Sequence, residues 1–288
     1  MTYLFILLSA ACSLLIAHLL KVTEVKKLRT LNTLTINYIS AAIIALIVGI
    51  GYDGGAYRQE WLANGWTIWL FTLAVGFFFI SNFIAYSKSV HLNGVGITIT
   101  GMRLSLLIPV LLSVYVYDEY LTLLQTTGVL LVFIALVLLI PKKSTARIGN
   151  ISAGWLLLII FLLSGFADAS LKIYKEEFSN RLNELHFMAM VFLGAFVIGA
   201  AASLYRKGPF CTREELKLGI MIGIPNLYSA IFLIYALDDI TGSIAYPMVN
   251  MLSVAGGTAL GLIRWDDSIS SLQWAGLIIA VISILILL

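Results

Sequence analysis

A single charged side chain, Arg103, interrupts an otherwise uncharged run of the sequence from residue 89 to residue 117. At the centre of a membrane-spanning helix an arginine costs about 2.5 to 3.5 kcal/mol even on lenient insertion scales, so its side chain must face protein, water or a ligand. A planar guanidinium can grip a carboxylate or phosphate through two hydrogen bonds, which makes Arg103 a candidate for holding an anionic group. Two structural alternatives stay open: an ion pair with Asp168, or a cap on the carbonyl groups of a broken helix.

Asp168 is the one acidic residue that falls clearly within a long apolar segment. A carboxyl group in such surroundings can take up a proton, so Asp168 is a candidate for proton coupling. The alternative is an ion pair with Lys172, one helical turn later. His18, one turn before Lys21, could relay protons near neutral pH or make hydrogen bonds at the membrane interface.

Three prolines lie within or at the start of apolar segments: Pro109, Pro225 and Pro247. Each removes a backbone hydrogen bond and frees a carbonyl group, and such helix breaks tend to line cavities in membrane transporters. Several amide and phenol side chains lie near these prolines or one turn apart in another apolar segment. They are candidates for binding a substrate, with hydrogen bonds between helices as the alternative. These candidates are Asn82, Tyr86, Asn226, Tyr228, Tyr246 and Asn250.

The chain that must position these residues has 288 residues, of which 60% are hydrophobic and 11% are charged. Soluble domains use about a quarter of their residues for charge, whereas about 20 apolar residues cross a bilayer as a helix. The sequence therefore predicts an all-α integral membrane protein with ten transmembrane helices and no room for a soluble catalytic or nucleic-acid-binding domain. The predicted spans are 2–20, 32–51, 66–87, 94–116, 121–140, 153–172, 185–204, 217–237, 243–263 and 271–288.

Lysine and arginine are distributed unevenly between the two sides of this predicted bundle. The odd-numbered loops hold Lys21, Lys26, Lys27, Arg29, Lys88, Lys142, Lys143, Arg147, Arg206, Lys207, Arg213, Lys217 and Arg264. The even-numbered loops hold Arg58, Lys172, Lys175 and Arg181. By the positive-inside rule the odd loops face the cytoplasm and both termini lie outside.

The two halves of the sequence resemble each other. Residues 118–128 match residues 266–276, since each segment has an acidic pair followed by a fixed Gln and Gly. Ser13 and Lys21 correspond in the same way to Ser164 and Lys172. Because five helices are an odd number, the second half must enter the membrane from the opposite side. We therefore expect two inverted five-helix repeats, residues 1–145 and 146–288, with a substrate site between them.

Two small-residue motifs indicate where helices approach closely. Gly219 and Gly223 are spaced by four residues, as are Gly257 and Gly261. This spacing lets helix backbones come together. We expect packing at both motifs, with a hinge or rocking surface as the alternative.

The sequence also resembles a known family, the EamA-like ten-helix transporters of the drug/metabolite transporter superfamily, over essentially its whole length. The residues that carry the resemblance are Asn93-Gly94-Val95-Gly96, Pro109, Glu119-Tyr120-Leu121-Thr122, Gln125 and Gly128, with Gly242, Asp267, Gln273 and Gly276 in the second half. The resemblance implies a central cavity lined by helices one to four and six to nine, with helices five and ten at the periphery. It also implies termini in the cytoplasm, opposite to the Lys and Arg count, and Gly257 stands where a second proline would correspond to Pro109.

These observations predict a secondary active transporter of a small polar metabolite, such as an amino acid or a sugar phosphate, in the inner (plasma) membrane. We expect an exporter or exchanger that works by alternating access as a monomer or homodimer, surrounded by lipid, without nucleic acid, metal or cofactor. A flippase for lipid-linked substrates and a non-transporting membrane subunit are alternatives. An intramembrane enzyme is the least expected class, because His18, His91 and His186 all lie near span ends and Asp168 has no second buried carboxylate.

Overall fold

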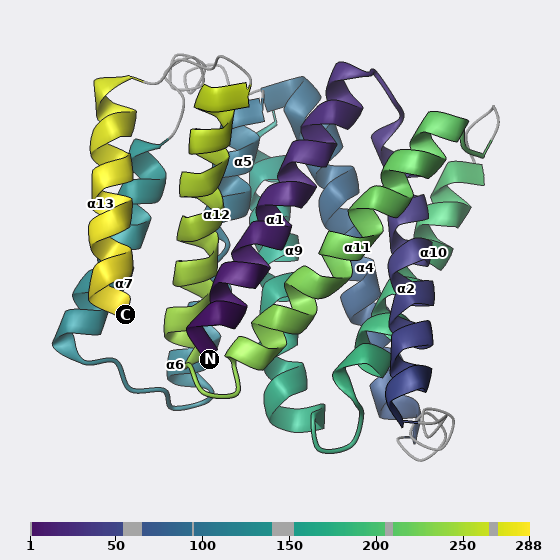
Figure 1. Ribbon diagram of the computed structural model, residues 1–288, viewed down its shortest axis with the longest axis horizontal. Coiled ribbons are helices and arrows are strands. Elements are labelled where there is room, and N and C mark those ends of the chain that lie inside the picture. Colours follow the sequence, from purple (N-terminus) through teal and green to yellow (C-terminus); the bar gives the residue numbers. More distant parts are fainter. Residues whose placement is uncertain (1, 54–64, 94, 140–152, 205–209, 265–269) are drawn as a thin grey trace.

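The computed structural model describes residues 2–53, 65–93, 95–139, 153–204, 210–264 and 270–288 as a bundle of helices (Figure 1). All regular secondary structure in these ranges is helical. The helices are α1 (Thr2–Val25), α2 (Thr30–Asp53), α4 (Gly65–Asn93), α5 (Val95–Leu104), α6 (Leu107–Tyr115), α7 (Leu123–Leu138), α9 (Gly154–Ile173), a π-helical turn η2 (Tyr174–Phe178), α10 (Glu184–Leu204), α11 (Arg213–Ala236), α12 (Gly242–Arg264) and α13 (Ser271–Leu287).

Seven of the helical segments in the described part of the chain are long and apolar enough to cross a membrane. Three shorter apolar helices, Gly101–Tyr115, Leu123–Leu138 and Ser271–Leu287, complete the bundle. Large apolar side chains are exposed on many of these helices, which is the surface that a bilayer covers. The chain is therefore a helical multi-pass membrane protein. The predicted boundary between the two repeats, at residues 145 and 146, lies outside the described residues.

The fourth predicted span is broken near its middle, between α5 and α6. Pro109 lies in the first turn of α6, where it has no N–H to donate to the carbonyl of Ser105, four residues earlier. The carbonyl groups of Arg103 and Ser105 instead accept short-range bonds, from the backbone N–H groups of Leu106 and Ile108 at 3.4 and 2.9 Å. Arg103 consequently lies in the last turn of α5, directly before the break.

The other two prolines behave differently. Helices α11 and α12 continue through Pro225 and Pro247. The prediction of helix breaks at these two positions is wrong, because a proline removes only one bond of the ladder and the neighbouring turns carry the helix past it.

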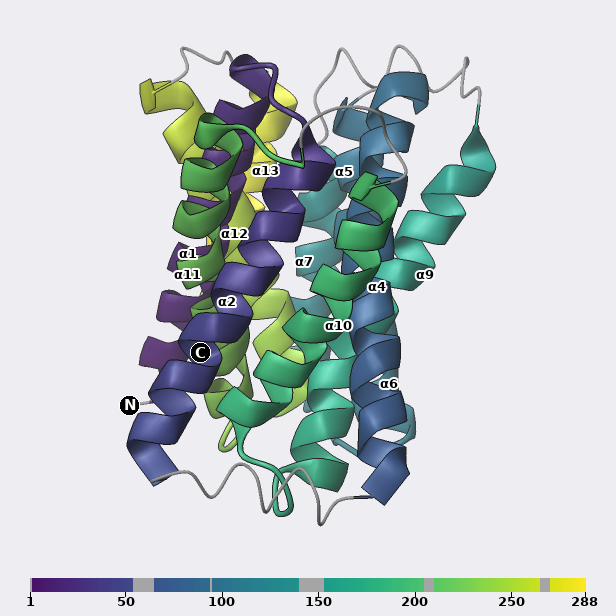
Figure 2. The same ribbon diagram turned by 90° about the vertical axis from the view of Figure 1, so that its right-hand side faces the viewer.

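Helices from the two halves of the chain pack against each other throughout the bundle. α1 lies along α11 and α4 lies along α9, while α2 packs against both α10 and α11. α7 and α13 pair at one edge, as Figure 1 shows at the left. The second view shows that the long helices run between the same two ends of the bundle (Figure 2). The hydroxyl of Tyr3 donates to the carbonyl of Leu288 at 3.1 Å, so the beginning of α1 and the end of α13 meet.

The first small-residue motif packs as expected. A Cβ atom on Gly219 would come within 2.6 Å of the Cβ of Ile36, and one on Gly223 within 2.9 Å of the Cβ of Ser40, so α11 lies directly against α2. A Cβ atom on Gly257 would meet its nearest neighbour, Leu14, only at 3.9 Å. The second motif therefore does not hold two backbones together.

The fixed Gln and Gly of the two similar segments have matching structural roles. Gln125 and Gln273 each occupy the third position of a helix and close a capping box, with Thr122 and with Ser270 respectively. Each box satisfies backbone N–H groups that the first turn of a helix leaves free. The glycines at 128 and 276 lie where α7 and α13 touch, close to side chains of Leu287 and Leu138.

Candidate functional site

A central cavity of about 240 Å³ lies where α1, α4, α5, α9, α11 and α12 meet. Six of the nine polar or ionisable residues that the sequence singled out line this cavity. They are Asn82, Arg103, Asp168, Asn226, Tyr246 and Asn250. Residues that are up to 168 positions apart in the chain, Asn82 and Asn250, thus share one polar chamber.

Arg103 reaches this cavity from the broken end of α5. One of its terminal nitrogens, Nη1, donates a hydrogen bond to Oδ1 of Asn250 at 3.0 Å. The amide nitrogen of Asn250 in turn donates to the backbone carbonyl of Tyr246 at 3.1 Å, which fixes the orientation of the amide. The Nε atom of Arg103 is buried and makes no hydrogen bond to the described residues. Arg103 is therefore held from one side by Asn250 and keeps a buried donor in need of a partner.

Asp168 lies across the same cavity on α9. Its carboxylate forms no ion pair within the described ranges, while its backbone carbonyl accepts a hydrogen bond from the Tyr246 hydroxyl at 2.9 Å. The alternative interpretation of an Asp168–Lys172 pair is wrong. The Lys172 ammonium binds Glu119 and Glu176 instead, at 2.7 and 2.5 Å, and Lys172 does not line the cavity.

Asparagine and serine side chains complete the polar lining. Asn226 donates to Oδ1 of Asn37 at 3.1 Å, whereas Oδ1 of Asn82 is buried with no hydrogen-bond partner among the described residues. The hydroxyls of Ser13 and Ser229 lie 2.8 Å apart and link α1 to α11. The amides are thus of two kinds: Asn37 and Asn226 hold helices together, as the structural alternative expected, and Asn82 has a free buried acceptor.

A second, wider chamber of about 520 Å³ adjoins the first and shares Arg103, Phe83 and Met102 with it. Tyr86 and His18 line this second chamber. Gly257 and Gly261 also line it, which explains why a Cβ atom at Gly257 would meet no close neighbour. Lys21, Glu24 and Thr30 line it as well, so the chamber extends to the end of the bundle where α1 ends and α2 begins.

Two expectations about the lining need correction. The second and seventh spans, α2 and α10, were expected to line the cavity but contribute only Thr30 to the two chambers. The close contact at Gly219 packs α2 against α11, so α2 does not reach the cavity. The remaining candidate, Tyr228, stacks on Phe232 with ring centroids 5.7 Å apart and lines neither chamber.

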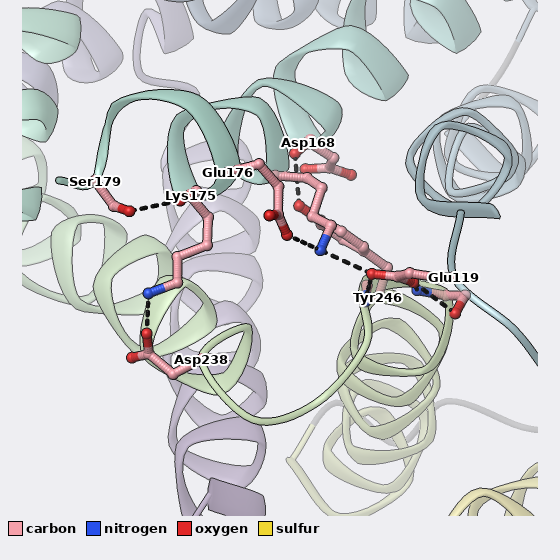
Figure 3. Close-up of polar contacts among 10 residues, drawn as sticks. Glu119, Asp168, Lys175, Glu176, Ser179, Asp238 and Tyr246 are labelled. Atoms are coloured by element: carbon pink, nitrogen blue, oxygen red, sulfur yellow. Dashed lines mark hydrogen bonds and ion pairs between the residues drawn. The ribbon is translucent and has the colours of Figure 1, made fainter. Parts of the chain in front are cut away.

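A cluster of ion pairs, with Lys172 and Glu119 buried at its centre, lies at the opposite end of the bundle. The carboxylate of Glu119 accepts hydrogen bonds from the backbone N–H groups of Gly242 and Ser243, at 2.8 and 2.9 Å, at the first turn of α12. The same carboxylate pairs with Lys172, which is only 4% exposed. Figure 3 shows Glu119 and Glu176 reaching the same nitrogen from two sides. A further pair, Lys175 with Asp238, ties η2 to the connection between α11 and α12.

Electrostatics stabilise the ionised form of Glu119. Burial by itself raises the pKa of this carboxyl group, but the hydrogen bonds from Lys172, Ser243 and Gly242 outweigh burial and lower the pKa below its ordinary value. A Cβ atom on Gly242 would come within 2.3 Å of the Ser113 hydroxyl, so only glycine lets the start of α12 approach this carboxylate without displacing its surroundings.

Sequence reasoning missed this cluster. In the sequence, Lys172 stands out as a possible partner for Asp168, as a loop charge and as the counterpart of Lys21. Glu119 belongs to a repeated motif and to the family resemblance, and none of these features pairs it with Lys172. A signal was nevertheless available, because Glu119 and Lys172 are the residues whose counterparts in the repeat are Asp267 and Lys21. Because each half has an acidic and a basic residue at equivalent positions, an ion pair between Glu119 and Lys172 could have been predicted. As for metals, no group of three or more His, Cys, Asp or Glu that could bind an ion occurs among the described residues.

Comparisons with known proteins give the fold but no activity. No protein-family model matches the sequence. The chain is 26% identical over 279 residues to an uncharacterized protein of Haemophilus influenzae, covering 95% of this chain and 93% of that one. It is also similar to a protein of known crystal structure, with a TM-score of 0.77 at 13% identity, covering 99% of this chain and 95% of that chain. At this identity the structural likeness shows a shared fold alone.

Proposed function

We propose that the chain is a secondary active transporter of a small polar metabolite that works by alternating access, as a relative of the EamA-like drug/metabolite transporters. One observation carries the proposal. A polar cavity bearing Arg103 and Asp168 in mid-bundle adjoins a chamber that reaches one end, while the Glu119–Lys172 pair closes the other end. A site that is accessible from one side only is the arrangement that alternating access requires.

The helix packing supports two inverted five-helix repeats. The first span packs on the eighth (α1 on α11), and its counterpart, the sixth, packs on the third (α9 on α4). The second and seventh spans pack on each other, as do the fifth and tenth. Matching capping boxes at Gln125 and Gln273 add local support. These four pairings are the ones that a two-fold axis in the membrane plane, relating the two halves, would produce.

The Lys and Arg count assigns the open end to the cytoplasm. The wider chamber is lined by Lys21, Glu24 and Thr30, at the end of the bundle that carries the first of the lysine-rich odd loops. In the inner membrane of a bacterium this state takes substrate from the cytoplasm, which fits an exporter or exchanger. Labelling of a cysteine introduced at residues 26–29 by an impermeant reagent added outside the cell would contradict this orientation.

Transport in proteoliposomes tests the proposal. Purified protein is first screened by thermal shift against amino acids, sugar phosphates and nucleotides, because a ligand that binds only the native state raises its apparent stability. Uptake of each hit is then measured for wild type, Arg103→Ala and Asp168→Asn. Both variants lose transport of the hit, whereas Lys26→Gln, which removes an exposed charge from the same end of the bundle, keeps it. Normal transport by both cavity variants overturns the site assignment.

The wider chamber favours one second candidate, a flippase for a lipid-linked substrate. Much of its wall is apolar, with Leu14, Phe83, Ile99, Met102 and Leu260, and could hold an acyl or prenyl chain while Arg103 holds a phosphate. Movement of a fluorescent lipid phosphate between leaflets, with no uptake of water-soluble hits, would favour this candidate over the first.

A further inference from the structure

The central cavity contains one fixed positive and one fixed negative charge that do not neutralise each other by direct contact. Arg103 and Asp168 are the only charged side chains among the residues that line it. They influence each other electrostatically, but Arg103 makes its hydrogen bond to Asn250 and the Asp168 carboxylate has no ion-pair partner in the described ranges. Arg103 and Asp168 face the same small cavity from different helices. The space between these two side chains therefore has a positive side and a negative side.

Building on the proposed function, we propose that this cavity selects a small zwitterion of zero net charge. The substrate carboxylate binds the Arg103 guanidinium, and the substrate ammonium group binds the Asp168 carboxylate. If no metabolite can be shown to move across the membrane, the proposed function fails. If the metabolite that moves is an anion, a cation or an uncharged solute, the function stands and this inference fails.

The carboxylate half of the site follows from the hydrogen bonds of Arg103. Asn250 occupies Nη1, whereas the buried Nε atom makes no hydrogen bond to the described residues. Neighbouring guanidinium N–H groups match the spacing of carboxylate oxygens and bind them in a bidentate manner. Because Asn250 is itself anchored on the Tyr246 carbonyl, the guanidinium is oriented before the ligand arrives.

The ammonium half lies on the wall made by α9 and the helix that packs beside it, α4. Asp168 supplies a carboxylate from α9, and Asn82 supplies a buried amide oxygen without a partner from α4. An ammonium group has three N–H donors and no acceptor, so it is chemically matched to a wall that presents acceptor oxygens. A burial cost remains at an unpartnered acceptor until such a donor fills the site.

Charge balance favours a zwitterion over a ligand that carries a single charge. A buried charge without a partner is costly, so each charge in the cavity needs a counter-charge. A monoanion on Arg103 leaves Asp168 uncompensated unless the carboxyl group is protonated, and a monocation on Asp168 leaves Arg103 uncompensated. A zwitterion balances both groups without a proton. A proton and the substrate ammonium group then compete for the Asp168 carboxylate. Proton coupling through Asp168 is therefore an exchange of a proton for the substrate.

The rest of the wall indicates an apolar third substituent. Phe79, Phe83, Leu233 and Val249 line the same cavity and offer no hydrogen bonds from their side chains. Leucine is therefore a suitable probe, because two close derivatives keep its side chain and change only its charge. N-acetyl-leucine is an anion and leucine methyl ester is a cation near neutral pH.

The test measures uptake of radiolabelled L-leucine, N-acetyl-leucine and leucine methyl ester into proteoliposomes. Wild type prefers L-leucine to either derivative by about tenfold or more. Asp168→Asn moves the preference to N-acetyl-leucine, and Arg103→Gln moves it to the methyl ester, since each variant leaves one charge in the cavity. Lys26→Gln and Glu214→Gln, the two halves of an exposed ion pair, keep the wild-type order.

A reversal of preference cannot arise from loss of folding, which lowers all three rates together. The inference is overturned if wild type prefers N-acetyl-leucine or the methyl ester. It is also overturned if the order of the three probes is the same in Asp168→Asn, Arg103→Gln and wild type.

Discussion

Removing the Lys172 ammonium should open the closed end of the bundle. Lys172 is 4% and Glu119 is 8% exposed in the ion pair that joins α9, the segment before α7 and the start of α12. Breaking a buried pair by deleting one partner costs about 3 to 5 kcal/mol, because the other charge stays buried alone. Glu119 keeps its bonds to two backbone N–H groups, so the lower end of this range applies.

The cost falls mainly on the closed state, since opening this end separates the elements that the pair joins and lets water reach Glu119. About 3 kcal/mol changes an equilibrium by roughly two powers of ten, at about 1.4 kcal/mol for each factor of ten. Lys172→Met is therefore expected to raise access to the central cavity from the end that carries the termini by about 100-fold. Glu176 adds little, because it is 39% exposed and its charge is screened by water.

Cysteine labelling measures this access. A cysteine replaces Ser164, which lines the central cavity, in a background carrying Cys12→Ser and Cys211→Ser. An impermeant maleimide is added only from the side of the termini, in proteoliposomes whose orientation is read from a terminal tag. Lys172→Met accelerates labelling, and Lys26→Gln, which breaks an exposed pair, leaves the rate unchanged.

A double variant guards against a folding defect. Combining Glu119→Gln with Lys172→Met leaves no uncompensated charge, so it is expected to fold at least as well as the single variant while still lacking the ion pair. If both proteins elute as wild type does on size exclusion and both label at the wild-type rate, the Glu119–Lys172 pair does not close this end.

Three further outcomes are expected. Gly219→Ala lowers the thermal unfolding temperature in detergent, because its Cβ atom falls 2.6 Å from the Cβ of Ile36 and overpacking costs about 1 to 3 kcal/mol; an unchanged midpoint would contradict the close contact of α11 and α2. Asn250→Ala weakens substrate binding about tenfold in a titration by thermal shift, since Arg103 loses its hydrogen-bond partner; equal affinity would mean that Asn250 does not orient the guanidinium. Because the pKa of Glu119 is lowered from its ordinary value of 4.5, ionised Glu119 stabilises the closed end fully above about pH 4.5, and this stabilisation is lost as the pH falls through the folded-state pKa. The rate of maleimide labelling, corrected for reagent reactivity, should be constant from pH 7 to pH 5 and rise only below pH 5. A rise in the labelling rate near pH 6 would contradict this assignment.

Much of the candidate site could be predicted from the sequence because polar groups are so costly in lipid. Arg103, Asp168, Asn82 and Asn250 stand out in apolar segments, and a membrane helix can bury such groups only toward other helices or a cavity. That physical constraint is strong enough to bring them together without any knowledge of the packing. The missing N–H of a proline is a local property, but it marked a break only at Pro109, because α11 and α12 continue through Pro225 and Pro247.

The parts that could not be predicted depend on contacts between distant segments. Tyr228 and Tyr246 look alike in the sequence, since each is a tyrosine close to a proline in an apolar segment. Tyr228 stacks on Phe232, whereas Tyr246 donates a hydrogen bond to the backbone of α9. The rotation of each helix about its axis determines which side chain faces the cavity. The closure at Glu119 and Lys172 joins residues 53 positions apart whose individual positions near helix ends look like ordinary solvated charges. Glycine spacing likewise did not reveal that Gly257 faces a chamber.

The most direct test of the account is counterflow across a proteoliposome membrane. Vesicles loaded with unlabelled L-leucine are diluted into a trace of radiolabelled L-leucine, so that exchange concentrates the label inside without any other driving force. Wild type and Lys26→Gln are expected to accumulate the label transiently, whereas Arg103→Gln and empty vesicles are expected to accumulate none. Accumulation by Arg103→Gln at the wild-type level would contradict the central claim that substrate crosses the membrane through the cavity of Arg103 and Asp168.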